Sequence, residues 1–215
     1  MPHRPCVRGH LLGLRTTAAC PTPNTAGSGH PRHTAQVTDT TKAKRRALLL
    51  IDFQEDFLAS EGRMPVDQGQ VQPAIEAARR TVGEARDQGD LIVKVGNEFR
   101  QRDVIGNLFR HHAAMKGSVG AAWDGRIDPS EAIYVPKWRS DAFCNPELMA
   151  LLEEERVGQV RLTGLYAKAC ITATAKGARK RGLSVQVIGN ATACSSEKSR
   201  QAALDKLRRI GIEVL

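Results

Sequence analysis

The stretch Ala47–Asp52, with the sequence ALLLID, decides the fold of this 215-residue chain. It holds an apolar run of strand length that leads directly into an acid. A short, continuous apolar run is typical of a strand that is buried on both faces, as in a parallel sheet. We therefore expect a buried parallel strand with Asp52 at its carboxyl end.

The same kind of run recurs along the chain, and helical patterns lie between the runs. Apolar runs predict further strands over 91–95, 132–135, 160–162, 183–188 and 212–215, and apolar residues at helical spacing predict helices over 73–88, 146–155, 170–181 and 196–209. The mixed segment 97–129 is expected to hold a helix over 107–115 and substrate-facing loops. Strands that alternate with helices specify a parallel sheet covered on both faces. The predicted fold class is α/β, a three-layer α/β/α doubly wound sheet.

Residues 1–43 differ in composition from the rest of the chain. They are rich in Pro, Thr, Gly, His and Arg, and they contain no acid before Asp39. Such a segment buries too little apolar surface to fold alone. We expect a disordered basic extension over 1–43 and one folded domain over 44–215. An organelle transit peptide and a start codon assigned too far upstream are both open as explanations of the extension.

The net charge of +9 is concentrated near the beginning of the sequence. Residues 1–45 hold seven basic residues and one acid, which leaves only +3 for the rest of the chain. A basic tail ahead of a nearly balanced domain does not predict a nucleic-acid-binding surface. No apolar run approaches the roughly 20 residues that cross a bilayer. We therefore expect a small-molecule substrate as the partner, and neither nucleic acid nor a membrane.

The chain has five cysteines, which are Cys6, Cys20, Cys144, Cys170 and Cys194. This odd number, with no CxxC pair and no secretory signal, argues against a disulfide framework. The pattern favours a reducing, cytoplasmic location, with organelle targeting by residues 1–43 as the less favoured alternative. Free thiols then become candidates for chemistry.

Three reactive side chains stand at predicted strand ends. Asp52 follows the first strand, Lys137 follows the third, and the fourth strand leads through a short segment to Cys170 at the start of a helix. In open α/β sheets, ligands bind beyond the carboxyl ends of the strands. Each residue alone has an ordinary structural explanation, as a turn acid, a solvated lysine or a small buried hydrophobe. The prediction of a catalytic site rests on the convergence of all three.

The three side chains suit nucleophilic catalysis. A helix N-terminus favours the thiolate and is expected to lower the pKa of Cys170. Asp52 would take the thiol proton and return it to a leaving amine, and Lys137 would keep that carboxylate ionised. His111 and His112 are the histidines outside the tail, and neither lies at a strand end. A Cys–His pair is therefore the less favoured arrangement.

Three motifs resemble those of a known family. The segments Ala47 to Phe57, Ile133 to Phe143 and Thr163 to Ile171 are similar to the opening strand, the lysine motif and the nucleophile segment of the isochorismatase-like cysteine hydrolase superfamily. The resemblance covers roughly residues 46–215. Each motif alone is weak, but the ordered trio is specific.

The resemblance implies a six-stranded parallel sheet in the order 3-2-1-4-5-6 and a catalytic triad of Asp52, Lys137 and Cys170. It also implies a cis peptide bond between Leu165 and Tyr166, with an oxyanion hole built from the backbone N–H groups of Tyr166 and Cys170. Typical members hydrolyse C–N bonds in small amides, ureides or carbamoyl compounds. Members commonly form homo-oligomers, so we expect one here.

Two departures from related families narrow the expected chemistry. Nicotinamidases resemble this pattern but carry an Asp-x-His metal motif soon after the second strand, where this chain has no histidine until His111. We therefore predict no bound metal and no cofactor. Isochorismatases tend to lack the cysteine, so Cys170 favours hydrolysis of an amide or ureide.

The sequence thus predicts a metal-independent cysteine amidohydrolase that acts through a Cys170 acyl-enzyme. The alternatives are an isochorismatase-type vinyl-ether hydrolase, in which Cys170 would be dispensable, and a non-catalytic scaffold that binds a protein partner. Phe57, Trp138 and Tyr166 are expected to wall the substrate pocket. Arg139 and Arg100 are candidates for holding a carboxylate.

Overall fold

Six strands form one parallel sheet in a computed structural model that describes residues 45–215. The extension predicted over 1–43 lies outside the described residues. The strand order is β3-β2-β1-β4-β5-β6, which confirms the predicted topology. The strands are β1 (Arg45–Ile51), β2 (Leu91–Asn97), β3 (Ile133–Lys137), β4 (Val157–Leu165), β5 (Ser184–Ala193) and β6 (Glu213–Val214).

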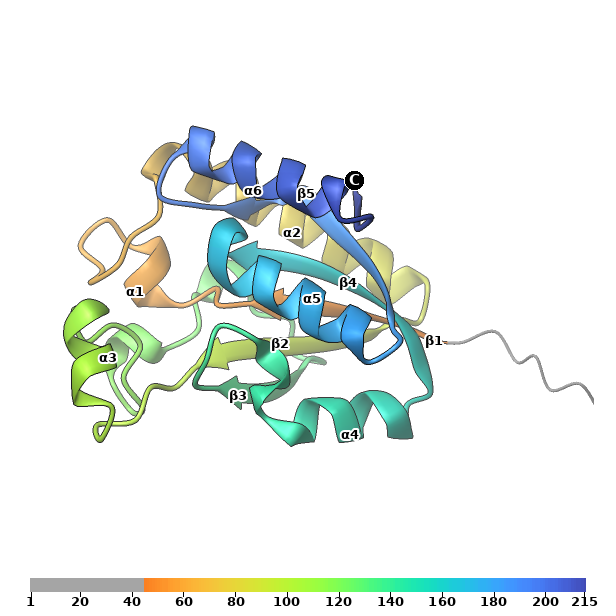
Figure 1. Cartoon of the computed structure of the whole chain (residues 1–215), viewed down its shortest axis with the longest axis horizontal. Coiled ribbons are helices and arrows are strands. Elements are labelled where there is room, and N and C mark those ends of the chain that lie inside the picture. The colour runs from red at the N-terminus through yellow and green to blue at the C-terminus, as the bar shows by residue number, and fades with distance from the viewer. Residues whose placement is uncertain (1–44) are drawn as a thin grey trace, which may run out of the picture. The chain divides into compact units, whose positions relative to one another are not determined.

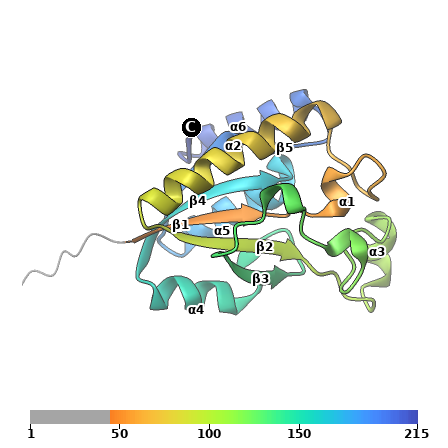
Figure 2. The same cartoon turned by 180° about the vertical axis from the view of Figure 1, so that it is seen from behind.

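Helices cover both faces of the sheet and make it the middle of three layers (Figures 1 and 2). The α-helices are α1 (Glu55–Leu58), α2 (Gln68–Asp87), α3 (Val104–Phe109), α4 (Pro146–Glu154), α5 (Thr172–Lys180) and α6 (Glu197–Arg209). One face packs against α2, and the other packs against α4, α5 and α6. Short α1 and α3 lie at the edge toward which the strands of Figure 1 point.

The apolar run of β1 is buried because each face of the sheet has its own core. Ala47, Leu49 and Ile51 pack in the cluster that contains α4, α5 and α6. Leu48 and Leu50 alternate with them and pack in the cluster that contains α2. All five side chains are fully buried. The central strand is therefore held from both sides, and Asp52 leaves it from a fixed position.

The helix predicted over 107–115 was wrong. The helix in this segment is α3, which begins after Asp103, whose carboxylate accepts a hydrogen bond from Gly106 N at 3.2 Å. The chain then turns through left-handed backbone at His111, His112 and Ala114. No helix continues through such φ values. The cap and the turns therefore set the helix bounds.

Two other elements extend beyond their predicted limits. Helix α2 begins five residues before the predicted start at Pro73, because the carboxylate of Asp67 caps it by accepting from Gly69 N at 3.0 Å. Strand β5 was predicted to end at Ile188 but runs on to Ala193, with an irregular register against β4.

Among the helices of residues 45–215, none combines the length and the apolar character that crossing a membrane requires.

Candidate active site

The three side chains predicted to converge meet in a buried cluster. Lys137, the last residue of β3, places its Nζ 2.9 Å from Oδ2 of Asp52 and 3.4 Å from Sγ of Cys170. Lys137 and Asp52 are 0% and 1% exposed, and Cys170 is 7% exposed. The ammonium group thus links a carboxylate and a thiol from three different strand ends.

Backbone geometry turns Asp52 into this cluster. Its φ of 59° lies in the left-handed region, which Asp tolerates better than most residues. Its N–H donates to the Val95 carbonyl at 2.8 Å, so the turn is tied to β2. Gly164 of β4 pairs with Ile51, and a Cβ at that glycine would lie 1.9 Å from the Ile51 oxygen. The chain therefore needs a glycine opposite the last residue before Asp52.

A buried amide holds the lysine from the side of β2. Lys137 Nζ donates to Asn97 Oδ1 at 2.7 Å. Asn97 is itself fixed by Gln54, which accepts from Asn97 N at 2.7 Å and donates to Asn97 O at 2.9 Å. Sequence reasoning assigned no role to either residue. The position of Asn97 at the end of β2 was the signal that was available.

Burial and charge set the protonation of the cluster. Burial is the largest influence on Asp52 and raises its pKa, against the opposing charge of Lys137. Burial lowers the pKa of Lys137, but the negative charge of Asp52, together with the contact to Cys170, outweighs it, and the net pKa is raised. The lysine therefore carries its charge at neutral pH.

The predicted lowering of the Cys170 pKa was wrong. Burial and the negative charge of Asp52 raise the pKa of the thiol to about 12, although Lys137 opposes them. Desolvation disfavours the charged form of any group, and it is the largest influence on this thiol. Cys170 is therefore a thiol in the resting site and needs a base beside it to become a nucleophile.

The segment that carries Cys170 begins with the predicted cis peptide bond between Leu165 and Tyr166, which the structure contains. A π-helical turn over Ala167–Ile171 follows and leads into α5, so helical backbone begins three residues before the predicted start at Cys170, and the α-helix itself begins at Thr172. The N–H groups of Ala169 and Ile171 both donate to the Tyr166 carbonyl. Among the backbone hydrogen bonds of residues 45–215, the N–H of Cys170, which lies between these two donors, does not donate to the Tyr166 carbonyl.

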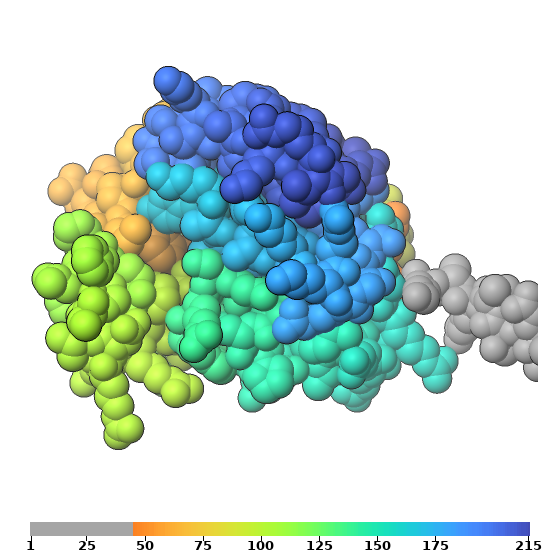
Figure 3. All heavy atoms as spheres, viewed as in Figure 1, coloured from red at the N-terminus to blue at the C-terminus, as the bar shows by residue number. Residues whose placement is uncertain are grey.

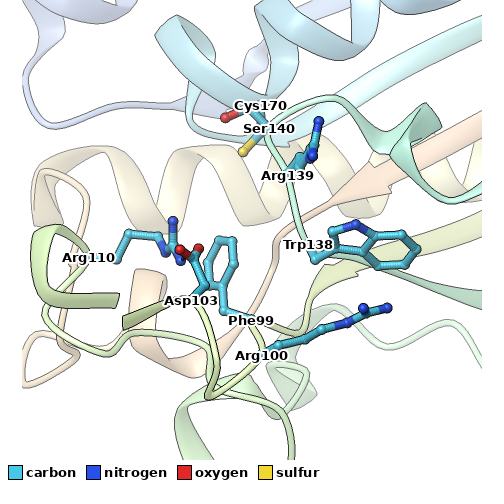
Figure 4. Close-up of a pocket in the computed structure, with 8 residues that line it drawn as sticks. All are labelled: Phe99, Arg100, Asp103, Arg110, Trp138, Arg139, Ser140 and Cys170. Carbon is cyan, nitrogen blue, oxygen red and sulfur yellow. Dashed lines mark hydrogen bonds and ion pairs between the residues drawn. The ribbon is translucent and has the colours of Figure 1, made fainter. Parts of the chain in front are cut away.

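A cavity of about 500 Å³ opens beside Cys170. Its lining, drawn in Figure 4, consists of Phe99, Arg100, Asp103, Arg110, Trp138, Arg139, Ser140 and Cys170. The sulfur of Cys170 points into the space between these side chains (Figure 4). In Figure 3 the surface is hollowed between the yellow-green segment that carries α3 and the blue-green surface beside it. A small molecule in this cavity would lie against the thiol.

Of the three residues expected to wall the pocket, Trp138 lines this cavity, and Phe57 and Tyr166 do not. Phe57 is 3% exposed and packs edge-to-face against Tyr166, with ring centroids 5.8 Å apart. The Tyr166 hydroxyl donates to the Met64 carbonyl. Both rings are therefore tied into the core near α1, and Trp138 is the one of the three that reaches the cavity.

The residues around the site do not fit a metal centre. Within the described part of the chain, no group of three or more His, Cys, Asp or Glu side chains is arranged to hold a metal ion. His111 and His112 are exposed and are not among the residues that line the cavity. The alternative of a Cys–His pair therefore finds no support in the lining of this cavity.

A doubly wound sheet with a buried cluster of charged and nucleophilic side chains and a cavity at its strand ends is the arrangement typical of an α/β enzyme. Residues 46–215 match the family model of the isochorismatase domain. The chain belongs to the isochorismatase family of hydrolases.

Three relatives cover nearly the same part of the chain. An uncharacterized isochorismatase family protein of Bacillus subtilis is 27% identical over 79% of this chain and 98% of its own length. The nicotinamidase/pyrazinamidase of Mycobacterium tuberculosis is 25% identical, with the same two coverages. The crystal structure of an isochorismatase-like hydrolase from Alkaliphilus metalliredigens has a TM-score of 0.72 and 26% identity, covering 79% of this chain and 93% of that chain.

Proposed function

We propose that the chain is a metal-independent cysteine amidohydrolase that cleaves a C–N bond in a small amide, ureide or carbamoyl compound. The observation that carries the proposal is the single ammonium group of Lys137 in contact with both the Asp52 carboxylate and the Cys170 sulfur. The amide-hydrolysing relative named nicotinamidase/pyrazinamidase supports the same class of reaction.

The first half of the reaction transfers an acyl group to sulfur. Asp52 takes the proton of the Cys170 thiol, and the thiolate attacks the substrate carbonyl carbon. The negative oxygen that forms is held by the N–H groups of Tyr166 and Cys170, as an oxyanion hole. Asp52 returns the proton to the nitrogen, the C–N bond breaks, and ammonia or an amine leaves. The acyl group remains on Cys170 as a thioester.

The second half releases the product. Asp52, again ionised, takes a proton from water, and the resulting hydroxide attacks the thioester carbonyl. The C–S bond breaks, the proton returns to sulfur, and a carboxylic acid leaves. Lys137 stays charged throughout and offsets the negative charge that moves between carboxylate and sulfur. The raised pKa of Asp52 suits this exchange, because a general base works best when its pKa lies nearer neutral pH.

The test is ammonia release from a panel of small amides and ureides. Cys170→Ala is expected to lower turnover by about a thousandfold or more. Cys144→Ala is the matched control, since Cys144 is a free thiol that does not line the cavity. Unchanged turnover in Cys170→Ala would overturn the proposal. Turnover of a vinyl ether by that same variant would favour the isochorismatase-type alternative, and a chain that turns over nothing would favour the scaffold.

We also propose that the enzyme is a homo-oligomer that associates through α3. Val104, Ile105, Leu108 and Phe109 of this helix are 68–78% exposed. Clustered exposed apolar side chains mark interaction surfaces. Analytical ultracentrifugation is expected to show a dimer or larger species that Phe109→Glu dissociates. A monomeric wild type would contradict this.

The cytoplasmic location and the lack of a nucleic-acid partner stay predictions.

A further inference from the structure

The cavity beside Cys170 carries more positive than negative charge on its walls. Three guanidinium groups and one carboxylate line it, from Arg100, Arg110, Arg139 and Asp103. The Asp52–Lys137 pair beneath them is an ion pair and adds no net charge. A bound molecule would therefore meet an excess of two positive charges.

One of the three arginines is already engaged. Arg110 forms an ion pair with Asp103 at 2.5 Å, donates to Asn107 Oδ1 at 2.9 Å and stacks over the Phe99 ring at 3.9 Å. These contacts neutralise the carboxylate of the wall and hold the guanidinium in place. Arg110 is therefore part of the frame of the cavity.

The other two arginines supply the excess charge. Neither Arg100 nor Arg139 forms an ion pair with a carboxylate of residues 45–215. Arg100 stacks over the Trp138 ring at 4.9 Å, and Figure 4 shows it running beside that ring. Its guanidinium is thus held flat against an aromatic wall of the cavity.

The backbone of Arg139 contacts the proposed catalytic cluster. Lys137 Nζ donates to the backbone carbonyl of Arg139 at 3.3 Å and to Cys170 Sγ at 3.4 Å. One atom of the catalytic cluster therefore ties the backbone of Arg139 to the nucleophile. Figure 4 shows the Arg139 side chain in the wall that contains Ser140 and Cys170.

We propose that the cavity selects substrates that carry a carboxylate, and that Arg139 binds this group while Cys170 attacks the C–N carbonyl. The planar guanidinium matches a carboxylate with two parallel hydrogen bonds. Trp138, with Arg100 stacked on it, forms another part of the cavity lining. The inference rests on the proposed function, because it takes Cys170 as the nucleophile.

Two alkylating reagents of nearly the same shape test the charge preference without requiring the natural substrate. Iodoacetate and iodoacetamide both alkylate a thiolate: an S–C bond forms, the C–I bond breaks, iodide leaves, and the thiol proton passes to Asp52 or solvent. Only iodoacetate carries a carboxylate. Rates are followed for each cysteine by peptide mass mapping of the full chain. The measured quantity is the iodoacetate-to-iodoacetamide rate ratio at Cys170, relative to that at Cys144.

We expect this relative ratio to be about ten or more, because a charge-assisted hydrogen bond contributes enough free energy for such a factor. Arg139→Gln is expected to bring it close to one, and Arg139→Lys to retain part of it. Arg102→Gln is the matched control: it removes the same charge from an exposed position that does not line the cavity, and leaves the ratio unchanged. Added salt should weaken the preference.

The outcomes separate the two proposals. Carboxylate selection would be overturned by equal rate ratios at Cys170 and Cys144, or by a high ratio at Cys170 that survives Arg139→Gln. The nucleophile proposal would still stand if Cys170 reacts faster than the other cysteines. Slow reaction of Cys170 with both reagents would count against the nucleophile instead. In that case, carboxylate selection is tested by comparing the binding of benzoate and of benzamide to the Cys170→Ala variant. Tighter binding of benzoate that is lost when Arg139→Gln is added supports carboxylate selection, and equal binding of the two compounds overturns it.

Discussion

The floor and the rim of the cavity are built differently. The floor is the buried cluster of Asp52, Lys137 and Cys170, which come from the strand ends and are at most 7% exposed. Of the three, Cys170 lines the cavity, and Lys137 links its sulfur to Asp52. The rim includes Arg100 and Arg139, which are exposed and lie on connecting segments. Sites on strands hold their geometry more firmly than sites on loops. In the proposed function, the bond-breaking chemistry therefore lies on the rigid part of the molecule and the selection of the substrate on the adaptable part.

The largest expected effect comes from removing the base in the floor. Asp52→Asn should lower kcat on an amide substrate by about a thousandfold, because proton transfer to and from the reacting groups is lost. Asp103→Asn changes the same functional group in the rim and should cost far less. Steady-state kinetics of both variants check this. Equal losses would break the distinction between floor and rim.

Removing the charge that stabilises the floor comes next. Lys137→Met should lower the free energy of unfolding by about 3 kcal/mol or more, because the buried carboxylate of Asp52 loses its partner. Lys116→Met is the control, since the Lys116 side chain is 74% exposed and its loss should change stability by less than about 0.5 kcal/mol. Urea denaturation measures both. Similar values for the two variants would contradict a charge-paired floor.

A smaller effect is expected in the aromatic wall. Trp138→Ala should raise KM by about three- to tenfold with kcat less affected, because an aromatic contact contributes about 0.5–1.5 kcal/mol. Val119→Ala, at a position that is 85% exposed and outside the cavity lining, should leave both constants unchanged. A loss confined to kcat in Trp138→Ala would place this side chain in the chemistry of the floor.

The smallest change concerns the acid limb of the pH profile. Burial raises the pKa of Asp52 above the ordinary value for an aspartate, so the carboxylate is protonated at a higher pH than an exposed aspartate. Activity should therefore fall on acidification while ordinary carboxylates are still ionised. The pH dependence of kcat/KM measures the position of this limb. A limb at the ordinary pKa of an aspartate would show that the base is not buried.

The sheet and the floor could be predicted because their signals are local. The run ending in Asp52 and the strand leading to Cys170 show their burial in the sequence, and parallel strands bring their carboxyl ends to one edge. The bracing of Lys137 by Asn97 could not be assigned, because it depends on a side-chain contact between two strands.

Trp138, Arg100 and Arg139 of the rim were named from the sequence, but the α3 side of the rim escaped prediction for a different reason. The bounds of α3 follow from the cap at Asp103 and from a hydrogen bond that Ala114 N donates to the distant Asp56 at 2.7 Å. Helical periodicity carries no information on such long-range contacts. The thiol pKa of Cys170 was predicted with the wrong sign because the sequence shows the helix terminus but not the depth of burial.

Gly164 gives the enzyme a spacing that is set by a missing side chain. Its φ of 119° and the 1.9 Å approach of a hypothetical Cβ to the Ile51 oxygen leave no room for any other residue between the two central strands. Those strands deliver the acid and the thiol. An engineer who redesigns the rim for new substrates is therefore free to change Arg139 or Trp138, but position 164 must stay glycine, although it does not line the cavity.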